Sequence, residues 1–146
     1  MVTFISSSPA ETEAIGTQLA EDLDAGSVLA LKGELGSGKT ILTKGLVTGL
    51  GSTAAATSPT FAIVHEYQGG RLPIYHFDFF RLENRESADR LGFDDYFFSD
   101  GVCVIEWANR FPDLVPAHAR WIFFDIKSEC GRTITLLDYR NENSCA

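Results

Sequence analysis

The sequence has little of two things that whole classes of protein depend on, cysteine and positive charge. It holds three cysteines in 146 residues, an odd number, and no two of them have C-x-x-C spacing. This excludes the disulfide framework of small secreted proteins and favours a reducing compartment. Twelve Lys and Arg stand against 20 Asp and Glu, which gives a net charge of −8. Proteins that grip a phosphate backbone by themselves carry the opposite charge, so tight and direct binding of nucleic acid is disfavoured.

Long apolar segments are also missing. Apolar runs such as Val28–Leu31 and Val102–Ile105 are short, whereas a membrane-spanning helix needs roughly 20 residues. The first residues, MVTFISSSPAETEA, lack the basic start and the apolar stretch of a secretory signal peptide. We therefore expect a cytoplasmic protein that makes no contact with membranes.

What the sequence does contain is typical of a single globular domain, which we expect to span residues 1–146. Its composition is 45% hydrophobic and 22% charged. A chain of this length buries roughly 70% of its unfolded surface when it folds, so its core needs neither a metal nor disulfides. No repeat, low-complexity tract or linker divides the chain.

The residue patterns predict alternating strands and helices. Ser8-Pro9-Ala10-Glu11 has the form of a capping box, and the apolar residues after it recur at helical spacing, which predicts a helix over residues 9–24. A second helix is predicted over 40–50. Gln68-Gly69-Gly70 predicts the turn of a hairpin, and helical or irregular structure is expected over 82–100. Strands are predicted at residues 27–32, 61–67, 72–78, 102–106, 120–126 and 132–138.

The clearest chemical signal is a phosphate-binding loop between the first predicted strand and the second helix. Gly33-Glu34-Leu35-Gly36-Ser37-Gly38-Lys39-Thr40 matches G-x-x-x-x-G-K-[ST]. The glycines let the backbone wrap a phosphate, and the following helix adds its positive N-terminal end. Lys39 is predicted to reach the β- and γ-phosphates, and the Thr40 hydroxyl to bind Mg²⁺. The predicted nucleotide contacts are Gly33, Leu35, Gly36, Ser37, Gly38, Lys39 and Thr40.

This loop and the order of elements predict the fold class. We expect an α/β protein with a three-layer, P-loop NTPase-like fold. Its central sheet should be mixed and mainly parallel, with some antiparallel strands.

Two apolar runs end in a carboxylate, and either acid could serve the phosphate loop. They are Pro73–Asp78 and Val102–Glu106, and open α/β sheets bind ligands at the carboxyl ends of their strands. The second run has the more uniform hydrophobicity of a central strand, so we predict that Glu106 binds Mg²⁺. Asp78 is then the candidate for orienting an attacking water. Alternatively, each acid simply ends its strand at the surface.

Further motifs give the chain a family resemblance. In order and spacing it is similar to the bacterial TsaE (YjeE) family, with its switch-like S-P-T-F, its H-x-D-x-Y-R and its E-W. Two positions depart from the family pattern: Phe80 stands where Tyr is usual, and Ser37 where Ala is common. The matching segments besides the phosphate loop are Ser58-Pro59-Thr60-Phe61, His76-Phe77-Asp78-Phe79-Phe80-Arg81, Leu91-Gly92, Asp95-Tyr96-Phe97 and Glu106-Trp107.

The resemblance implies a small ATPase needed for N6-threonylcarbamoyladenosine at position 37 of transfer RNAs, with ATP and Mg²⁺ as cofactors. It implies that Thr40 and Glu106 lie at the metal and that Asp78 and Thr60 lie near the γ-phosphate. Arg132 matches, more loosely, a family position near the nucleotide. The catalytic candidates are then Asp78, Glu106, Lys39 and Thr60.

The resemblance also implies partners. The family's subunit docks on the TsaD transferase in complex with TsaB and uses ATP hydrolysis to keep that complex turning over, so contact with tRNA is only indirect. Two other functions stay open from the residues: a small-molecule kinase, and a nucleotide-gated assembly factor in which hydrolysis is secondary. Three side chains also keep two interpretations: Arg81 as a solvated charge or a γ-phosphate contact, Trp107 as a core or surface aromatic, and His76 as a packing residue or a catalyst.

Overall fold

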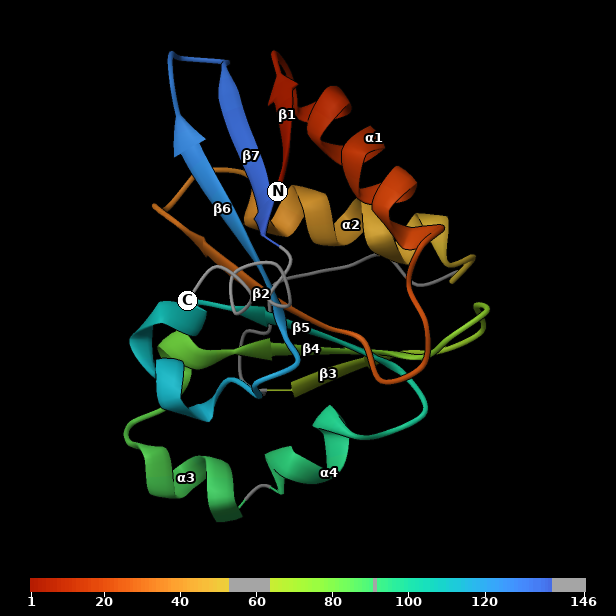
Figure 1. The fold of residues 1–146 in the computed structure, drawn as a ribbon, viewed down its shortest axis with the longest axis vertical. Helices are drawn as coiled ribbons and strands as arrows, with labels where there is room; N and C mark the ends of the chain where they lie inside the picture. Colours follow the sequence, from red (N-terminus) through yellow and green to blue (C-terminus); the bar gives the residue numbers. More distant parts are fainter. Residues whose placement is uncertain (53–63, 91, 138–146) are drawn as a thin grey trace.

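The computed structural model describes residues 1–52, 64–90 and 92–137 (Figure 1). These residues form a seven-stranded sheet in the order β1-β7-β6-β2-β5-β4-β3. The strands are β1 (Val2–Ser6), β2 (Val28–Gly33), β3 (Val64–Tyr67), β4 (Ile74–Asp78), β5 (Val102–Glu106), β6 (Arg120–Ile126) and β7 (Arg132–Leu137).

The middle of the sheet is parallel and its margins are antiparallel. Strands β6, β2, β5 and β4 pair in parallel. At one margin β3 pairs antiparallel with β4, and at the other β7 runs antiparallel between β6 and β1. The predicted α/β class, with a mixed and mainly parallel sheet, is confirmed. Residues 68–70 do lie in the connection between two antiparallel strands, β3 and β4, as the turn signal predicted.

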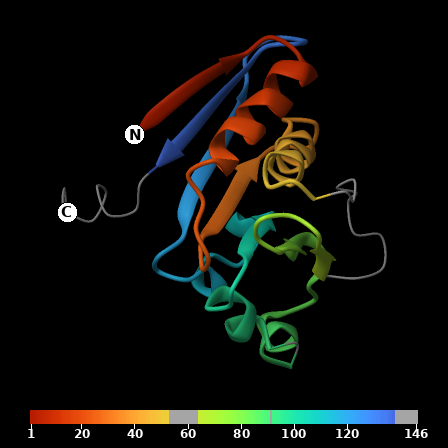
Figure 2. The ribbon, with the colours of Figure 1, turned by 90° about the vertical axis from the view of Figure 1, so that its right-hand side faces the viewer.

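Helices lie on both sides of the sheet. Helices α1 (Pro9–Ala20) and α2 (Lys39–Gly49) pack side by side, and α3 (Arg85–Arg90) and α4 (Phe93–Phe97) lie at the other end of the molecule (Figure 2). Three short 3₁₀ helices follow β4 and β5, namely η1 (Phe79–Arg81), η2 (Ala108–Arg110) and η3 (Pro112–Leu114). No helix among the described residues has the length and apolar character needed to cross a membrane.

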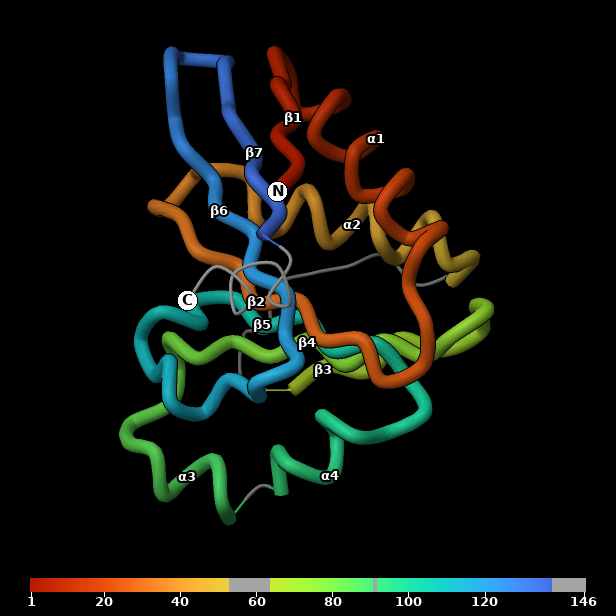
Figure 3. The backbone as a smooth tube through the Cα atoms, viewed as in Figure 1, coloured from red at the N-terminus to blue at the C-terminus, as the bar shows by residue number. Residues whose placement is uncertain are grey.

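Strand β2 explains why the sheet needs cover on both faces. Leu29 and Leu31 belong to the core under α1 and α2, whereas Val28 and Ala30 belong to the core under α3 and α4. Successive strand residues point to opposite faces, so a strand buried on both faces is apolar throughout. The backbone passes from this buried strand into α2 through the loop at residues 34–38 (Figure 3).

Glycines let α1 and α2 approach closely. A Cβ on Gly16 would lie 2.2 Å from the carbonyl oxygen of Leu42, and one on Gly45 would lie 2.0 Å from that of Glu13. Neither distance is possible for real atoms, so only glycine fits at these two positions. The first helix is therefore a direct support for α2, the helix that follows the phosphate loop.

Element bounds differ from the prediction mainly at α1, which ends at Ala20 and not at residue 24. Arg71 Nη2 donates to the carbonyls of Ala20 and Leu23, at 2.8 and 3.0 Å. The N–H of Asp24, which a continuing helix would bond to Ala20, donates instead to Ser27 Oγ at 3.1 Å. The Arg71 side chain, which is distant in sequence, therefore bonds carbonyls at the C-terminal end of the helix that a longer helix would bond itself.

The start of α1 largely follows the predicted capping box. Ser8 Oγ accepts from the N–H of Glu11 at 3.2 Å, while the Glu11 carboxylate accepts from Ser7 and not from Ser8. Strands β5 and β6 have the predicted bounds, and α2 begins at Lys39, one residue early. The first residues of the predicted strand 61–67 lie outside the described residues, and β3 is described from Val64.

Candidate nucleotide and metal site

The loop between β2 and α2 is shaped by its glycines. Gly36 and Gly38 have φ angles of +81° and +110°, a region that side chains rarely tolerate. A Cβ on Gly33 would lie 2.6 Å from Ser37 Oγ and 2.8 Å from Phe124 Cβ. The Oγ of Ser37 is buried and has no hydrogen-bond partner among the described residues. The loop therefore offers a curved backbone and a hydroxyl that is free to bond an anion.

Lys39, the first residue of α2, is 6% exposed and is held from two sides. Its Nζ donates to the carbonyl of Gly33 at 2.5 Å and lies 3.8 Å from the centroid of the Trp107 ring. Burial lowers the pKa of Lys39, and the nearby charges of Glu106 and Asp78 oppose that shift. The ammonium group is thus fixed in place at the loop, with carboxylates near it.

Trp107 occupies an unusual backbone conformation. Its φ of 60° makes it the one non-glycine residue with positive φ in the described part of the chain. Such a conformation costs free energy in a bulky residue and is found mostly at functional sites. Here it turns the indole over Lys39 directly after Glu106. The E-W pair in the sequence pointed to this position, but nothing in the sequence indicated the stacking on Lys39.

Thr40 and Glu106 meet although 66 residues separate them in sequence. Thr40 Oγ1 donates to Glu106 Oε1 at 2.9 Å. Glu106 Oε2 lies 3.3 Å from His76 Nε2, an ion-pair distance, although the two groups are not aligned as a well-formed hydrogen bond. Burial alone would raise the pKa of Glu106, but the contacts from His76 and Thr40 and the charge of Lys39 outweigh it and lower the pKa. A carboxylate kept ionised beside a threonine hydroxyl is suited to binding a hard cation.

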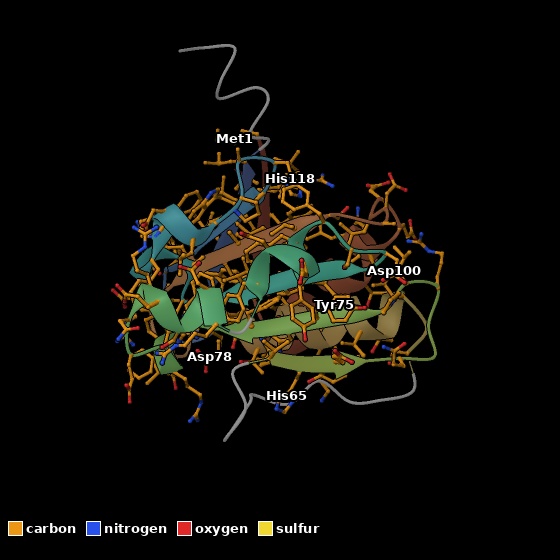
Figure 4. All side chains as sticks on the ribbon, turned by 90° about the horizontal axis from the view of Figure 1, so that it is seen from below. Met1, His65, Tyr75, Asp78, Asp100 and His118 are labelled. Atoms are coloured by element: carbon orange, nitrogen blue, oxygen red, sulfur yellow. The ribbon has the colours of Figure 1, made fainter. Side chains whose placement is uncertain are left out.

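Asp78 is the last residue of β4, and it lies opposite Glu106 in the parallel register. Figure 4 shows it near one end of β4, whereas Asp100 lies near the other end. Its Oδ1 accepts from the N–H of Phe80 at 3.1 Å, and its Oδ2 lies 3.5 Å from Arg81 Nε. Burial raises the pKa of Asp78, and the charge of Glu106 adds to this, whereas the Phe80 N–H and Arg81 oppose it.

These groups line one hollow. A cavity of about 290 Å³ is bordered by the phosphate loop from Leu35 to Ile41 together with Asp78, Glu106 and Trp107. The structure thus brings the two acids, Lys39 and Thr40 to one place.

Arg132 lies beside this cavity and not in it. Its Nη2 donates to the carbonyl of Gly36 at 3.2 Å and its Nη1 to that of Gly131 at 2.9 Å. It lines a separate, smaller hollow that also includes Ser37 and Gly38. Arg132 therefore supports the phosphate loop from outside, which sequence reasoning did not foresee. Thr60, with the rest of Ser58–Phe61, lies outside the described residues.

The donor set fits a Mg²⁺–nucleotide pair. Magnesium takes oxygen ligands and is usually held by one or two carboxylates together with substrate phosphates. In residues 1–52, 64–90 and 92–137, no group of three or more His, Cys, Asp and Glu side chains could hold a metal alone. One buried carboxylate beside a threonine, next to a glycine-rich loop whose Ser37 hydroxyl is buried and without a hydrogen-bond partner among the described residues, matches the shared arrangement.

Comparison with known proteins identifies the family. The family described as "Threonylcarbamoyl adenosine biosynthesis protein TsaE" matches residues 6–134. The chain belongs to the TsaE family. It is 45% identical over 127 residues to the TsaE protein of Bacillus subtilis, a match that covers 87% of this chain and 79% of that one. It is 38% identical over 132 residues to the TsaE protein of Treponema pallidum, covering 90% and 97% of the two chains.

A solved structure agrees with this TsaE assignment. The crystal structure of Bacillus subtilis YdiB superposes with a TM-score of 0.81 at 35% sequence identity, covering 99% of this chain and 89% of that chain. TsaE membership confirms the resemblance that the sequence motifs indicated. It also assigns the chain a role in the biosynthesis of threonylcarbamoyladenosine in tRNA.

Proposed function

We propose that this TsaE-family protein is a Mg²⁺-dependent ATPase that supports threonylcarbamoylation of adenosine 37 in tRNA by acting on the TsaB–TsaD transferase complex. The observation that carries the proposal is the 2.9 Å hydrogen bond from Thr40 to Glu106. It joins the end of the phosphate loop to the end of a central strand, next to the buried Lys39. A structural turn has no need of a lysine, a threonine and a carboxylate converging in one cavity.

The phosphate loop supplies binding. Its N–H groups and the N-terminus of α2 would hold the phosphates, and Lys39 would exchange its bond to Gly33 for the β- and γ-phosphate oxygens. Thr40 and Glu106 would hold the metal. Mg²⁺, when bound, supplies positive charge that neutralises the phosphates during transfer.

Asp78 supplies the orientation of the attacking water. Its carboxylate is held at one oxygen by the Phe80 N–H, and it lines the same cavity as Lys39. Hydrolysis needs little covalent help from the protein, so a water held in line by a fixed carboxylate is the main contribution expected of this residue. Thr60 stays a prediction for the γ-phosphate, and Arg132 for the nucleotide through its contact with the loop.

The experiment compares Lys39→Ala with Lys44→Ala, which removes an exposed lysine from the same helix. Phosphate release from ATP and threonylcarbamoyladenosine in tRNA are measured with TsaB and TsaD present. We expect Lys39→Ala to abolish both products and Lys44→Ala to retain both. Parent-level hydrolysis by Lys39→Ala would contradict the proposal.

One further variant separates an ATPase from an assembly factor. Asp78→Asn should still bind ATP but hydrolyse it slowly. If this variant supported tRNA modification at the parent rate, binding alone would suffice, and the protein would be a nucleotide-gated assembly factor.

A further inference from the structure

Arg110 joins the turn after β4 to the turn after β5. Helix η1 follows Asp78 and η2 follows Trp107, and the two contact each other. Arg110 ends η2, and its Nη1 donates a hydrogen bond to the carbonyl of Phe80 in η1. Its guanidinium carbon lies 5.5 Å from the ring centroid of Phe80 and 5.3 Å from that of Phe111.

No ion pair explains this position of Arg110. Within the described residues its guanidinium has no carboxylate within ion-pair distance, whereas nearby Arg85 pairs with Asp113. Arginine can donate to a carbonyl and stack on aromatic rings at the same time, because its donors lie in one plane. Arg110 therefore bonds the backbone carbonyl of Phe80 and packs on the rings of Phe80 and Phe111 at the same time.

Phe80 carries this restraint to Asp78. It bonds Arg110 through its carbonyl and Asp78 Oδ1 through its N–H, at 3.1 Å. Its ring also lies 5.2 Å from the ring of Trp107, although Phe80 itself is 60% exposed. The residue that fixes one oxygen of Asp78 is thus itself fixed from the β5 side of the cavity.

We propose that Arg110 is a positioning residue, which orients the Asp78 carboxylate relative to Glu106 by holding Phe80. Arg110 does not line the cavity of the candidate site. The kinetic part of this proposal rests on the proposed ATPase function, because it depends on the role given there to Asp78. The structural part does not depend on it.

The structural part is tested without nucleotide, by amide hydrogen exchange and ¹H–¹⁵N spectra. In Arg110→Ala the Phe80 amide should lose protection and shift, because Phe80 is released from η2. Arg85→Ala, the matched control, removes an exposed arginine from α3 that does not contact Phe80, and it should leave the Phe80 amide unchanged. An unchanged Phe80 amide in Arg110→Ala would overturn the proposal.

The kinetic part is tested by steady-state ATP hydrolysis. Arg110→Ala should lower kcat by about tenfold to a hundredfold, since small misplacements of catalytic groups have effects of this size. The KM for ATP should stay within about twofold, because the phosphate loop is untouched. Arg110→Lys, which keeps the charge without the planar fork, should recover only part of kcat.

A double variant separates positioning from general destabilisation. Adding Arg110→Ala to Asp78→Asn should cause no further loss, because the carboxylate that Arg110 orients is already gone. The same loss in both backgrounds would overturn the proposal. Lys39→Ala is assayed alongside: if it is fully active, the proposed ATPase function fails, and if it is inactive while Arg110→Ala equals the parent, only the role of Arg110 fails.

Discussion

At the scale of single residues, the candidate site places one buried lysine near two buried carboxylates. Lys39 faces both Asp78 and Glu106, and all three are less than 10% exposed. The two acids have the same chemistry, but their surroundings shift their pKa values in opposite directions. Contacts from His76 and Thr40 favour the ionised form of Glu106, whereas burial favours the neutral form of Asp78. Two acids whose environments separate them in this way are suited to different tasks.

The division of roles predicts different defects in the two acid variants. Glu106→Gln should weaken Mg²⁺–ATP binding by at least about tenfold, since it removes a charged partner of the metal. Asp78→Asn should leave the affinity nearly unchanged and lower kcat by about 10²–10⁴, a range typical for loss of a side chain that hydrogen-bonds the reacting group. Equilibrium titration with a nucleotide analogue, paired with steady-state rates, measures both. Equal losses of affinity in the two variants would contradict the assignment.

The raised pKa of Asp78 predicts a gain in stability when its charge is removed. The folded protein holds this proton more tightly than the unfolded chain does, so stability falls as the pH rises through the window between the two pKa values. Above that window the folded protein bears the full free-energy cost of the ionised, buried Asp78 carboxylate. Asp78→Asn should therefore raise the free energy of unfolding at pH 7 by about 0.5–2 kcal/mol, as is common for charges kept for function.

Urea unfolding across the pH range measures this effect. The gain should shrink towards pH 3, where the aspartate is protonated in both states. Asp94→Asn, an exposed acid on α4, is the control. A gain of the same size at both pH values would contradict the explanation.

At the scale of elements, the contact between α1 and α2 fixes the helix that carries Lys39 and Thr40 of the candidate site. The glycine positions at 16 and 45 bring the two backbones together, and Thr17 Oγ1 also donates to the carbonyl of Gly45 at 3.2 Å. A shift of α2 along this contact would move Thr40 away from Glu106. The precision of the site therefore depends on a helix that contributes no ligand to it.

Gly45→Ala tests this dependence. Alanine favours a helix over glycine by up to about 1 kcal/mol, but its Cβ would lie 2.0 Å from a backbone carbonyl that cannot move freely. The clash should dominate and lower the free energy of unfolding by about 1–3 kcal/mol. It should also weaken ATP binding. Lys44→Ala, on the exposed side of α2, should do neither, and a stabilised Gly45→Ala protein would show that the helices can separate at little cost.

The elements also show what the sequence could predict. Strands β5 and β6 have their predicted bounds, because burial on one or both faces leaves a clear apolar pattern in consecutive residues. The phosphate loop was equally clear, since its glycines follow from local backbone geometry. Three contacts of the site depend on which strands become neighbours in the sheet. They are the hydrogen bond between Thr40 and Glu106, the stacking of Trp107 on Lys39, and the hydrogen bond from Arg132 to the carbonyl of Gly36. Local patterns carry no information about that order.

At the scale of the whole molecule, the net charge of −8 and the composition of the site both favour action through protein partners. Hydrolysis of ATP needs positive groups beside the transferred phosphate to neutralise its negative charge in the transition state, and in P-loop NTPases an arginine for this purpose is often supplied by a partner. Here Arg81 is placed near the site, but it pairs with Asp78. The isolated protein therefore lacks a free arginine in the described part of its cavity.

We predict slow hydrolysis by the isolated protein and strong stimulation by TsaB and TsaD. A hundredfold stimulation requires about 2.7 kcal/mol of added transition-state stabilisation, which a few charge-assisted hydrogen bonds can provide. Hydrolysis at saturating ATP is measured against increasing partner concentration. A flat response, with an isolated rate already at about 1–10³ s⁻¹, would contradict the prediction and favour the kinase alternative.

The strand order has a consequence for how the chain acquires its site. Strand β2, which leads into the phosphate loop, pairs on one side with β5 and on the other with β6. The pairing partners of Leu29 are Val104 and Arg120, which come much later in the sequence. Among the described strands, β1 pairs only with β7, and Val2 lies opposite Leu136. Such long-range pairings close large loops, and they form late and slowly during folding. A growing chain on the ribosome thus carries the complete phosphate-loop sequence long before it has the sheet that gives the loop its shape, and the candidate site is complete only once the last third of the chain has been made.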